Sequence, residues 1–278
     1  MWINILMALG LILAVPCISQ ADSGLLVSKE TQTELHLRNA IIIPLTWPKE
    51  HKSFRVLVFT KSKEHRHESI PAGIAAIKEL GKDFGFEVQT TENDKVFTSN
   101  NLKKFKAVIF LLTTGNVLNS EEEKAFEGYI HSGGGFVAIH SACGTQKDWP
   151  WYGRLLGALF NGHSKPQNAR VRLRDDKSPS TAVLPHTWKR FDEWYNFKQL
   201  PQEVEVLADV DESTYKGGKM GKVHPIAWQH SFEGGRVWVT VMGHTKESYY
   251  DPLFLLHILG GIQFAAGLQD KSLSGQKQ

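Results

Sequence analysis

Short apolar runs and helical patterns alternate through the first half of this sequence. The apolar runs, which have the length and residue types of buried strands, lie at 54–60, 86–90, 107–112 and 136–139. Helical patterns separate them at 69–85, 100–105 and 120–131, the last starting with a capping box from Ser120 to Glu123. This alternation predicts a parallel sheet with right-handed crossovers and helices on both faces.

The second half of the sequence has a different pattern of apolar runs. Apolar runs at 169–174, 203–210 and 225–229 predict strands of an antiparallel extension to the sheet. The run Arg236–Met242 is expected to return to the parallel core, and Asp251-Pro252 to begin a closing helix. The chain is therefore predicted to be a mostly parallel α/β protein with an antiparallel extension.

Two of the predicted strands lead directly into a histidine. A turn of three glycines, Gly133–Gly135, precedes the strand that runs into His140, and the strand Arg236–Met242 delivers Gly243 and His244. Ligands of open α/β sheets bind just beyond the carboxyl ends of the strands. We therefore expect His140 and His244 to face each other across one hollow at the rim of the sheet, as acid/base catalysts or as metal ligands.

Further polar and aromatic side chains are candidates for the same site. They lie in the loop after the first strand, after a glycine-flanked segment near 162, in the sequence Asp-Glu-Trp-Tyr at 192–195, and in the strand at 225–229. Glu193 is expected to be catalytic together with the two histidines. The expected substrate contacts are His67, His163, Tyr195 and Trp228. His257, inside the closing helix, is instead expected to be packed in the core.

Composition and charge narrow the range of partners. Charged residues make up 22% of the chain and the formal net charge is +3, with no basic run. This argues against nucleic acid and against an anionic membrane surface as partners. The chain has eight tryptophans, whose flat faces suit ligands that are part apolar and part hydroxylated. A small-molecule carbohydrate is the expected partner, and the sequence leaves open whether the chain forms a homo-oligomer.

Residues 1–21 are predicted to be a signal peptide. The apolar run Ile3–Val15 is too short for a membrane span, and Ser19–Ala21 offers small residues for cleavage. We expect export to the periplasm or the exterior. A lipid anchor on Cys17 is disfavoured because Pro16 stands where a lipidation motif has a small residue. The remaining expected regions are an N-terminal extension at 22–53 with a strand near 40–43, one domain at 54–268 and a disordered tail at 269–278.

Several motifs occur in a fixed order from about Phe54 to Gly267. They are His65-Arg66-His67-Glu68-Ser69-Ile70, His140-Ser141-Ala142, Asp192-Glu193-Trp194-Tyr195, His224-Pro225-Ile226-Ala227-Trp228 and Gly243-His244-Thr245. Together they resemble the ThuA-like (trehalose-utilisation) family. The resemblance implies a flavodoxin-like, class I glutamine amidotransferase-like three-layer fold. It also implies a role in disaccharide or keto-sugar metabolism, and zinc binding in some relatives.

One departure from the wider amidotransferase superfamily bears on the chemistry. Those enzymes carry a nucleophilic cysteine on a strained turn after a strand, whereas this chain has His140-Ser141 at that point. Cys143 lies three residues beyond His140 and is expected to be a small buried residue. Without a thiolate no glutamyl thioester forms, so we expect no glutaminase activity.

Two mechanisms are open for a site built on His140 and His244. In one, the imidazoles move a proton α to a carbonyl, as keto-sugar isomerisation or elimination requires. In the other, histidines with a carboxylate such as Asp192 or Glu193 hold a zinc ion, which polarises the sugar carbonyl or assists a hydrolysis. We expect an exported enzyme acting on a glycoside or keto-sugar. The alternatives are a non-catalytic carbohydrate-binding module and an adaptor protein.

Overall fold

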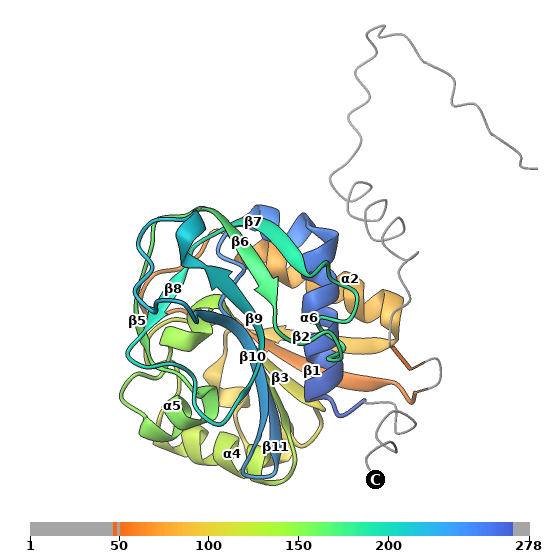
Figure 1. The fold of residues 1–278 in the computed structure, drawn as a ribbon. Helices are drawn as coiled ribbons and strands as arrows, with labels where there is room; N and C mark the ends of the chain where they lie inside the picture. Colours follow the sequence, from red (N-terminus) through yellow and green to blue (C-terminus); the bar gives the residue numbers. More distant parts are fainter. Residues whose placement is uncertain (1–46, 49–50, 269–278) are drawn as a thin grey trace, which may run out of the picture.

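The computed structural model describes residues 47–48 and 51–268. The predicted signal peptide, the tail at 269–278 and nearly all of the N-terminal extension, including the strand near 40–43, lie outside the described residues. Five parallel strands form the core of one sheet in the order β2-β1-β3-β4-β11 (Figure 1). Their bounds are β1 Phe54–Phe59, β2 Phe86–Thr91, β3 Ala107–Leu111, β4 Gly135–Ile139 and β11 Gly235–Thr240.

Four antiparallel strands extend this sheet beyond β11, in the order β10-β9-β6-β7. They are β6 Gln167–Leu173, β7 Thr187–Asp192, β9 Glu205–Asp211 and β10 Pro225–Phe232. The parallel core and its antiparallel extension are therefore confirmed. A separate two-stranded sheet, formed by β5 (Phe160–His163) and β8 (Tyr195–Phe197), was not predicted, and neither was β7.

Helices cover both faces of the parallel core. On one side lie α2 (Ile70–Phe84) and α6 (Pro252–Ala265), which contact each other. On the other side lie α3 (Ser99–Leu102), α4 (Ser120–His131) and α5 (Pro150–Leu156) (Figure 1). Short 3₁₀ turns occupy Asp94–Val96, His140–Gly144, Glu212–Thr214 and Lys246–Tyr250. Within the described ranges, none of these helices is long and apolar enough to cross a membrane.

The N-terminus of α4 differs from the prediction by one residue. Asn119, in extended backbone, caps the helix: its side chain accepts hydrogen bonds from Glu121 N and Glu122 N. The Glu122 carboxylate accepts in return from Asn119 N at 2.8 Å, which completes the capping box. The capping box predicted at Ser120–Glu123 was wrong by one position, because the observed box pairs Asn119 with Glu122. The run of three glutamates at 121–123 offers the required spacing to both Asn119 and Ser120.

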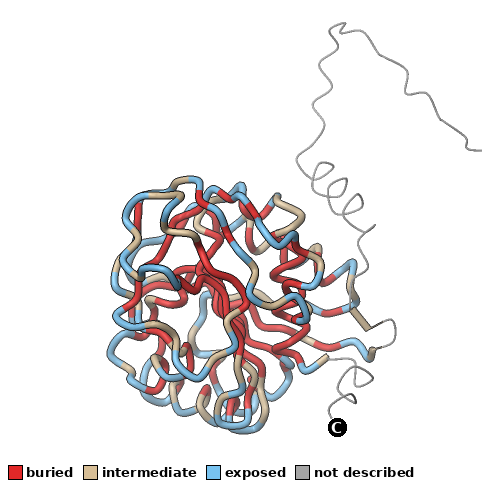
Figure 2. Tube along the Cα trace, in the orientation of Figure 1, coloured by how far each residue is buried: buried red, intermediate tan, exposed pale blue. Residues whose placement is uncertain are grey.

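Buried residues concentrate along the strands of the sheet (Figure 2), and apolar side chains pack on both of its sides. On the α4 side, the Phe110 ring packs against the rings of Phe126 and Phe136 at centroid distances of 5.5 and 5.2 Å. Each fully buried phenylalanine contributes about 2 kcal/mol through its apolar surface. On the α6 side, a Cβ at Gly261 would lie 2.3 Å from the Trp238 indole, so only glycine lets the helix approach β11 this closely.

His257 is buried in this core, as expected from its place in the closing helix. Its side chain is fully buried, and its Nδ1 lies 2.8 Å from the Ser180 carbonyl oxygen. Because a carbonyl oxygen only accepts, Nδ1 carries the proton in the neutral ring. Burial lowers the pKa of His257 from 6.5 to about 4, so the folded protein holds this imidazole neutral.

His257 should make the fold less stable in mild acid. Below pH 6.5 the unfolded chain protonates this imidazole, whereas the folded chain does so only near pH 4. The free energy of unfolding therefore decreases as the pH falls from 6.5 towards 4, by about 1.4 kcal/mol for each pH unit. Urea unfolding of His257→Asn between pH 7 and pH 5 should give a shallower pH dependence than the wild type. Equal slopes would contradict this assignment.

Candidate functional site

A cavity of about 480 Å³ opens at the carboxyl ends of the parallel strands. Its lining consists of Glu64, His65, His67, Thr114, Ser141, Gly144, Lys147, Phe160, His163, Glu193, Tyr195 and His244. Five of the sequence-predicted site residues are in this set. His140 lies directly behind the wall: its ring is fully buried and contacts the rings of His67, His244 and Tyr195.

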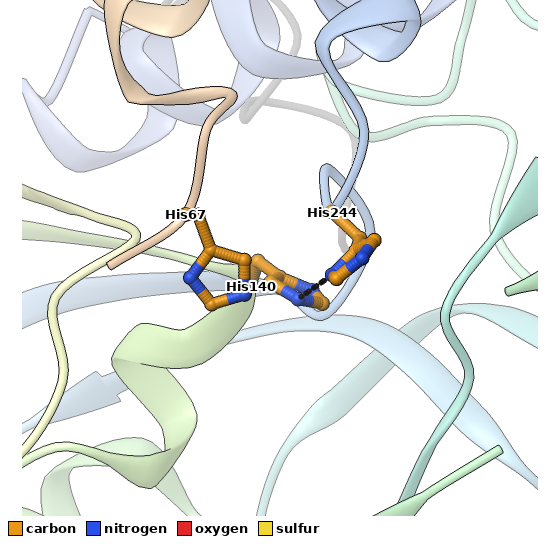
Figure 3. A group of neighbouring side chains, drawn as sticks. All are labelled: His67, His140 and His244. Carbon is orange, nitrogen blue, oxygen red and sulfur yellow. Dashed lines mark hydrogen bonds between the residues drawn. The ribbon is translucent and has the colours of Figure 1, made fainter. Parts of the chain in front are cut away.

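Three histidines from three separate loops meet beside the cavity (Figure 3). His67 follows β1, His140 follows β4 and His244 follows β11, so all three come from carboxyl ends of parallel strands. The three ring centroids lie 5.0 to 5.2 Å apart. One ring nitrogen from each histidine lies within 4.8 Å of the other two. His140 and His244 lie close together as expected, with His67 as a third member. They do not face each other across the hollow, because His140 is fully buried and does not line the cavity.

The backbone at His140 is strained in a way that directs its side chain. Its φ of 55° lies in the left-handed region, which non-glycine residues adopt only at a cost. The residue turns the chain from the end of β4 into the 3₁₀ segment His140–Gly144.

The hydrogen bonds of His140 fix the orientation of its ring. Its Nδ1 lies 2.7 Å from the Val241 carbonyl oxygen, so Nδ1 carries the proton in the neutral ring. The lone pair on Nε2 then points to the His244 Nδ1 at 3.2 Å and to the Tyr195 hydroxyl at 3.1 Å. Burial raises the pKa of Tyr195 well above its ordinary value, so its hydroxyl remains a hydrogen-bond donor.

His244 is held by a buried carboxylate that sequence reasoning did not identify as a support. Asp192 accepts hydrogen bonds from Gly243 N at 2.9 Å and His244 N at 3.0 Å. The Arg190 guanidinium donates to the same carboxylate at 3.1 Å and to Asp251 at 2.8 Å. With both oxygens engaged, Asp192 is not free to bind a metal, and Glu193 is the remaining candidate of that pair.

A second contact and a glycine complete the placement of this loop. Ser69, two residues after His67, donates a hydrogen bond to the His244 carbonyl at 2.8 Å, which ties the loop after β1 to the loop after β11. Gly243 has a φ of 110°, and a Cβ there would lie 2.8 Å from the Tyr249 hydroxyl. Any other residue at 243 would move His244 away from the cluster.

Burial and crowding lower the pKa values of two histidines in the site, while the Glu193 carboxylate stays ionised. Burial, reinforced by the neighbouring imidazoles, lowers the pKa of His67 from 6.5 to about 2. Burial and the nearby His140 also lower the pKa of His244. Burial opposes ionisation of Glu193, but the nearby His140, His244 and His163 side chains hold its pKa below the ordinary value. Neutral imidazoles at His67 and His244, beside an ionised carboxylate, offer lone pairs to a cation.

The local geometry fits a zinc ion. Among the described residues, the buried Nδ1 of His67 has no hydrogen-bond partner, and Figure 3 shows the other ring nitrogen, Nε2, on the side of His140. In a tetrahedral site with Zn–N bonds of about 2.0–2.1 Å, two nitrogen ligands lie about 3.3 Å apart. The observed separation between His140 Nε2 and His244 Nδ1 is 3.2 Å. The donor set of His67, His140 and His244 is therefore compatible with zinc.

Glu193 and His163 extend the site toward the cavity mouth. The Glu193 carboxylate lies 3.5 Å from both His140 Nε2 and His244 Nδ1, and its other oxygen lies 2.8 Å from His163 Nδ1. The His163 side chain is 49% exposed, so it connects the buried carboxylate with solvent. His163 and Tyr195 face each other in the register of the β5–β8 ribbon.

Two other residues lie away from the opening. Trp228 was expected to contact substrate, but it is fully buried and its indole donates to the Leu156 carbonyl at 2.7 Å. It does not line the cavity, because β10 is covered on both faces. Cys143 is a free, buried cysteine, and burial raises the pKa of its thiol, which disfavours a thiolate. The absence of glutaminase activity stays a prediction.

Comparison with known proteins gives consistent results. The chain is similar in structure to a ThuA-like protein from Bacteroides uniformis, with 26% identity, a TM-score of 0.68, and coverage of 81% of this chain and 96% of that chain. It is also similar to a ThuA-like protein from Parabacteroides merdae, with 18% identity, a TM-score of 0.66, and coverage of 82% of this chain and 93% of that chain. A comparison with curated proteins found no match.

A third likeness concerns the fold alone. A β-galactosidase from Bacillus circulans is 14% identical with a TM-score of 0.52, and the match covers 85% of this chain but 34% of that one. With the strand order described above, this agrees with the predicted class I glutamine amidotransferase-like fold. The model of the ThuA family, described as trehalose utilisation, matches residues 55–265. The chain therefore belongs to the ThuA family, which links it to carbohydrate utilisation.

Proposed function

We propose that this protein is an enzyme acting on a glycoside or keto-sugar, with a zinc ion held by His67, His140 and His244. The observation that carries the proposal is the convergence of three imidazoles beside one open cavity and an ionised, buried carboxylate. Such perturbed titratable groups, gathered in a cleft, are typical of active sites. Family membership supports a carbohydrate as the substrate.

Glu193 is suited to move the proton. When bound, zinc would act as a Lewis acid that polarises the sugar carbonyl and acidifies the adjacent carbon-bound proton. The Glu193 carboxylate, which lines the cavity, accepts that proton as the general base. His163, 2.8 Å away and half-exposed, then relays the proton to solvent or returns it to the neighbouring carbon. Return gives isomerisation, and loss of a β substituent gives elimination.

Tyr195 is suited to orient the His140 ring or the substrate. Its hydroxyl lies at the cavity wall, 3.1 Å from His140 Nε2, and remains protonated because burial raises its pKa. As a donor, it can hydrogen-bond either His140 or a negatively charged substrate oxygen that develops during proton transfer. Its place opposite His163 in the β5–β8 ribbon sets its position relative to His163.

One observation favours a second candidate that needs no metal. The 3.2 Å separation between His140 Nε2 and His244 Nδ1 also suits a direct hydrogen bond between the two rings. His244 would then act as the base, with Glu193 stabilising its imidazolium. The two candidates differ in whether turnover survives removal of metal.

Zinc binding should depend on the histidine cluster. After dialysis against a chelator, the protein should bind one zinc ion per chain in a calorimetric titration. His67→Ala and His244→Ala should each weaken binding by about a hundredfold or more, since losing a direct ligand costs at least as much as losing a residue that orients one. Turnover of a 3-keto-disaccharide should fall in the same variants.

A matched control is His131→Ala, an exposed histidine that pairs with Glu233 away from the cavity. This substitution should leave zinc affinity and turnover unchanged. Full turnover by the metal-free wild type would overturn the zinc proposal in favour of the His140–His244 pair. Sugar binding with no turnover by the zinc-loaded protein would favour a carbohydrate-binding module.

Asp192 should affect the site only through the loop that it holds. Asp192→Asn places an amide against two backbone donors and removes the charged partner of Arg190, so we expect a loss of about 3 kcal/mol in the free energy of unfolding. Zinc affinity should fall because His244 is no longer fixed. Asp251→Asn also weakens the pairing of Arg190 but leaves the Gly243 and His244 bonds intact. If both variants bind zinc equally well, Asp192 does not position His244.

A further inference from the structure

A second cavity of about 550 Å³ adjoins the histidine site. It lies between the segment 143–160, the loop at 198–203 and the end of β10. We name it the aromatic groove, defined by the lining residues Trp149, Leu156, Leu159, Phe160 and Phe232. Its volume is within the range of small-molecule sites.

The two cavities share one wall. Gly144, Lys147 and Phe160 line both of them. On the side of the histidine site, the Phe160 ring lies 4.6 Å from the Tyr195 ring and 6.2 Å from the His163 ring, measured between centroids. A ligand held at Glu193 and Tyr195 therefore lies beside Phe160, whose ring also lines the aromatic groove.

The groove is built to leave an apolar surface open. Leu159 is 43% exposed, one of the few large apolar side chains in the described residues that is so open to solvent. It packs over α5, where a Cβ at Gly153 would lie 2.7 Å from the Leu159 side chain. Trp149 stacks on Trp151 at a centroid distance of 4.9 Å, which fixes its orientation. Its indole N–H is bonded to Glu127, so the ring offers mainly its apolar surface to a ligand.

This chemistry distinguishes two kinds of occupant. A second sugar ring carries several hydroxyl groups, each of which needs a hydrogen-bond partner when desolvated. The aromatic groove instead offers leucine, phenylalanine and tryptophan side chains. Of its polar residues, Lys198 and Gln199 are exposed to solvent, the buried Gln146 amide is already bonded to Glu123 and Leu118, and only the half-buried His230 has ring nitrogens without a partner among the described residues. A flat apolar ring gains from burial here without losing hydrogen bonds.

We propose that the aromatic groove binds an apolar, aromatic aglycone of the substrate whose sugar ring occupies the histidine site. The preferred substrate class is then an aryl glycoside in its keto form, rather than a disaccharide. This inference rests on the proposed function for the position of the sugar ring. It adds an occupant for a cavity that the histidine chemistry does not use.

Paired glycosides test the proposal by binding, independently of turnover. We would titrate the zinc-supplemented protein with phenyl and methyl 3-ketoglucosides of both anomeric configurations and follow the heat of binding. The phenyl compound should bind about tenfold or more tightly than the methyl compound of the same anomer, because only the phenyl ring reaches apolar surface. Equal affinities for the two compounds would overturn the proposal.

A pair of exposed substitutions locates the effect. Leu159→Asp should weaken binding of the phenyl compound about tenfold and leave the methyl compound unchanged. Val223→Asp, at a residue 42% exposed outside both cavities, should change neither affinity. A phenyl preference that survives Leu159→Asp would overturn the assignment to this groove. Both sites are exposed, so both variants are expected to unfold at the wild-type temperature.

The assignment of the aromatic groove and the proposed function can be disproved independently of each other. A phenyl preference without turnover would contradict the proposed enzyme and leave the groove assignment standing. If neither glycoside binds, phenol alone provides the test of the groove, observed through the indole N–H resonance of Trp149 in the wild type. A shift of that resonance that is lost in Leu159→Asp would support the groove, and no shift would overturn it.

Discussion

The parallel pairing of β4 with β11 is the constraint on which the site depends. Ile139 and Thr240 are register partners, so the next residues of both strands leave the sheet side by side. This brings the Val241 carbonyl within 2.7 Å of His140 Nδ1 and thereby fixes the ring orientation of His140. It also starts the loop that carries His244 to the same point. Asp192, from the end of the antiparallel strand β7, then secures that loop through two backbone hydrogen bonds. The antiparallel extension is thus part of the site, because it supplies the residues that hold and face the histidines.

The cluster has an electrostatic character that follows from its crowding. Several imidazoles at close range cannot all be charged, and burial further disfavours their protonated forms. His67 shows the effect most strongly, with a pKa lowered to about 2. The same neighbours favour the anionic form of Glu193. Neutral imidazoles at His67 and His244 and an ionised Glu193 therefore coexist at neutral pH, which is a protonation pattern that suits zinc binding.

The sequence predicted those parts of the structure that follow from local pattern. Buried strands alternating with helices specify the parallel core, and the rule that sites lie at carboxyl ends of strands placed His140 and His244 together. Other features depend on tertiary context. The β5–β8 ribbon was missed because one strand contains Gly162 and the other has only three residues. Trp228 was misplaced because strand periodicity does not tell whether the second face of β10 is covered. The role of Asp192 depends on Arg190 and on backbone groups fifty residues away, which no local pattern reveals.

The central claim is that His67, His140 and His244 together form a metal centre in a member of the ThuA family. X-ray absorption spectroscopy at the zinc edge tests it most directly, using protein loaded with one equivalent of zinc. The account predicts scattering from imidazole ligands at about 2.0–2.1 Å, with fewer imidazoles in His67→Ala and in His244→Ala. Zinc bound without imidazole ligands, or with a ligand set unchanged by both substitutions, would contradict the account.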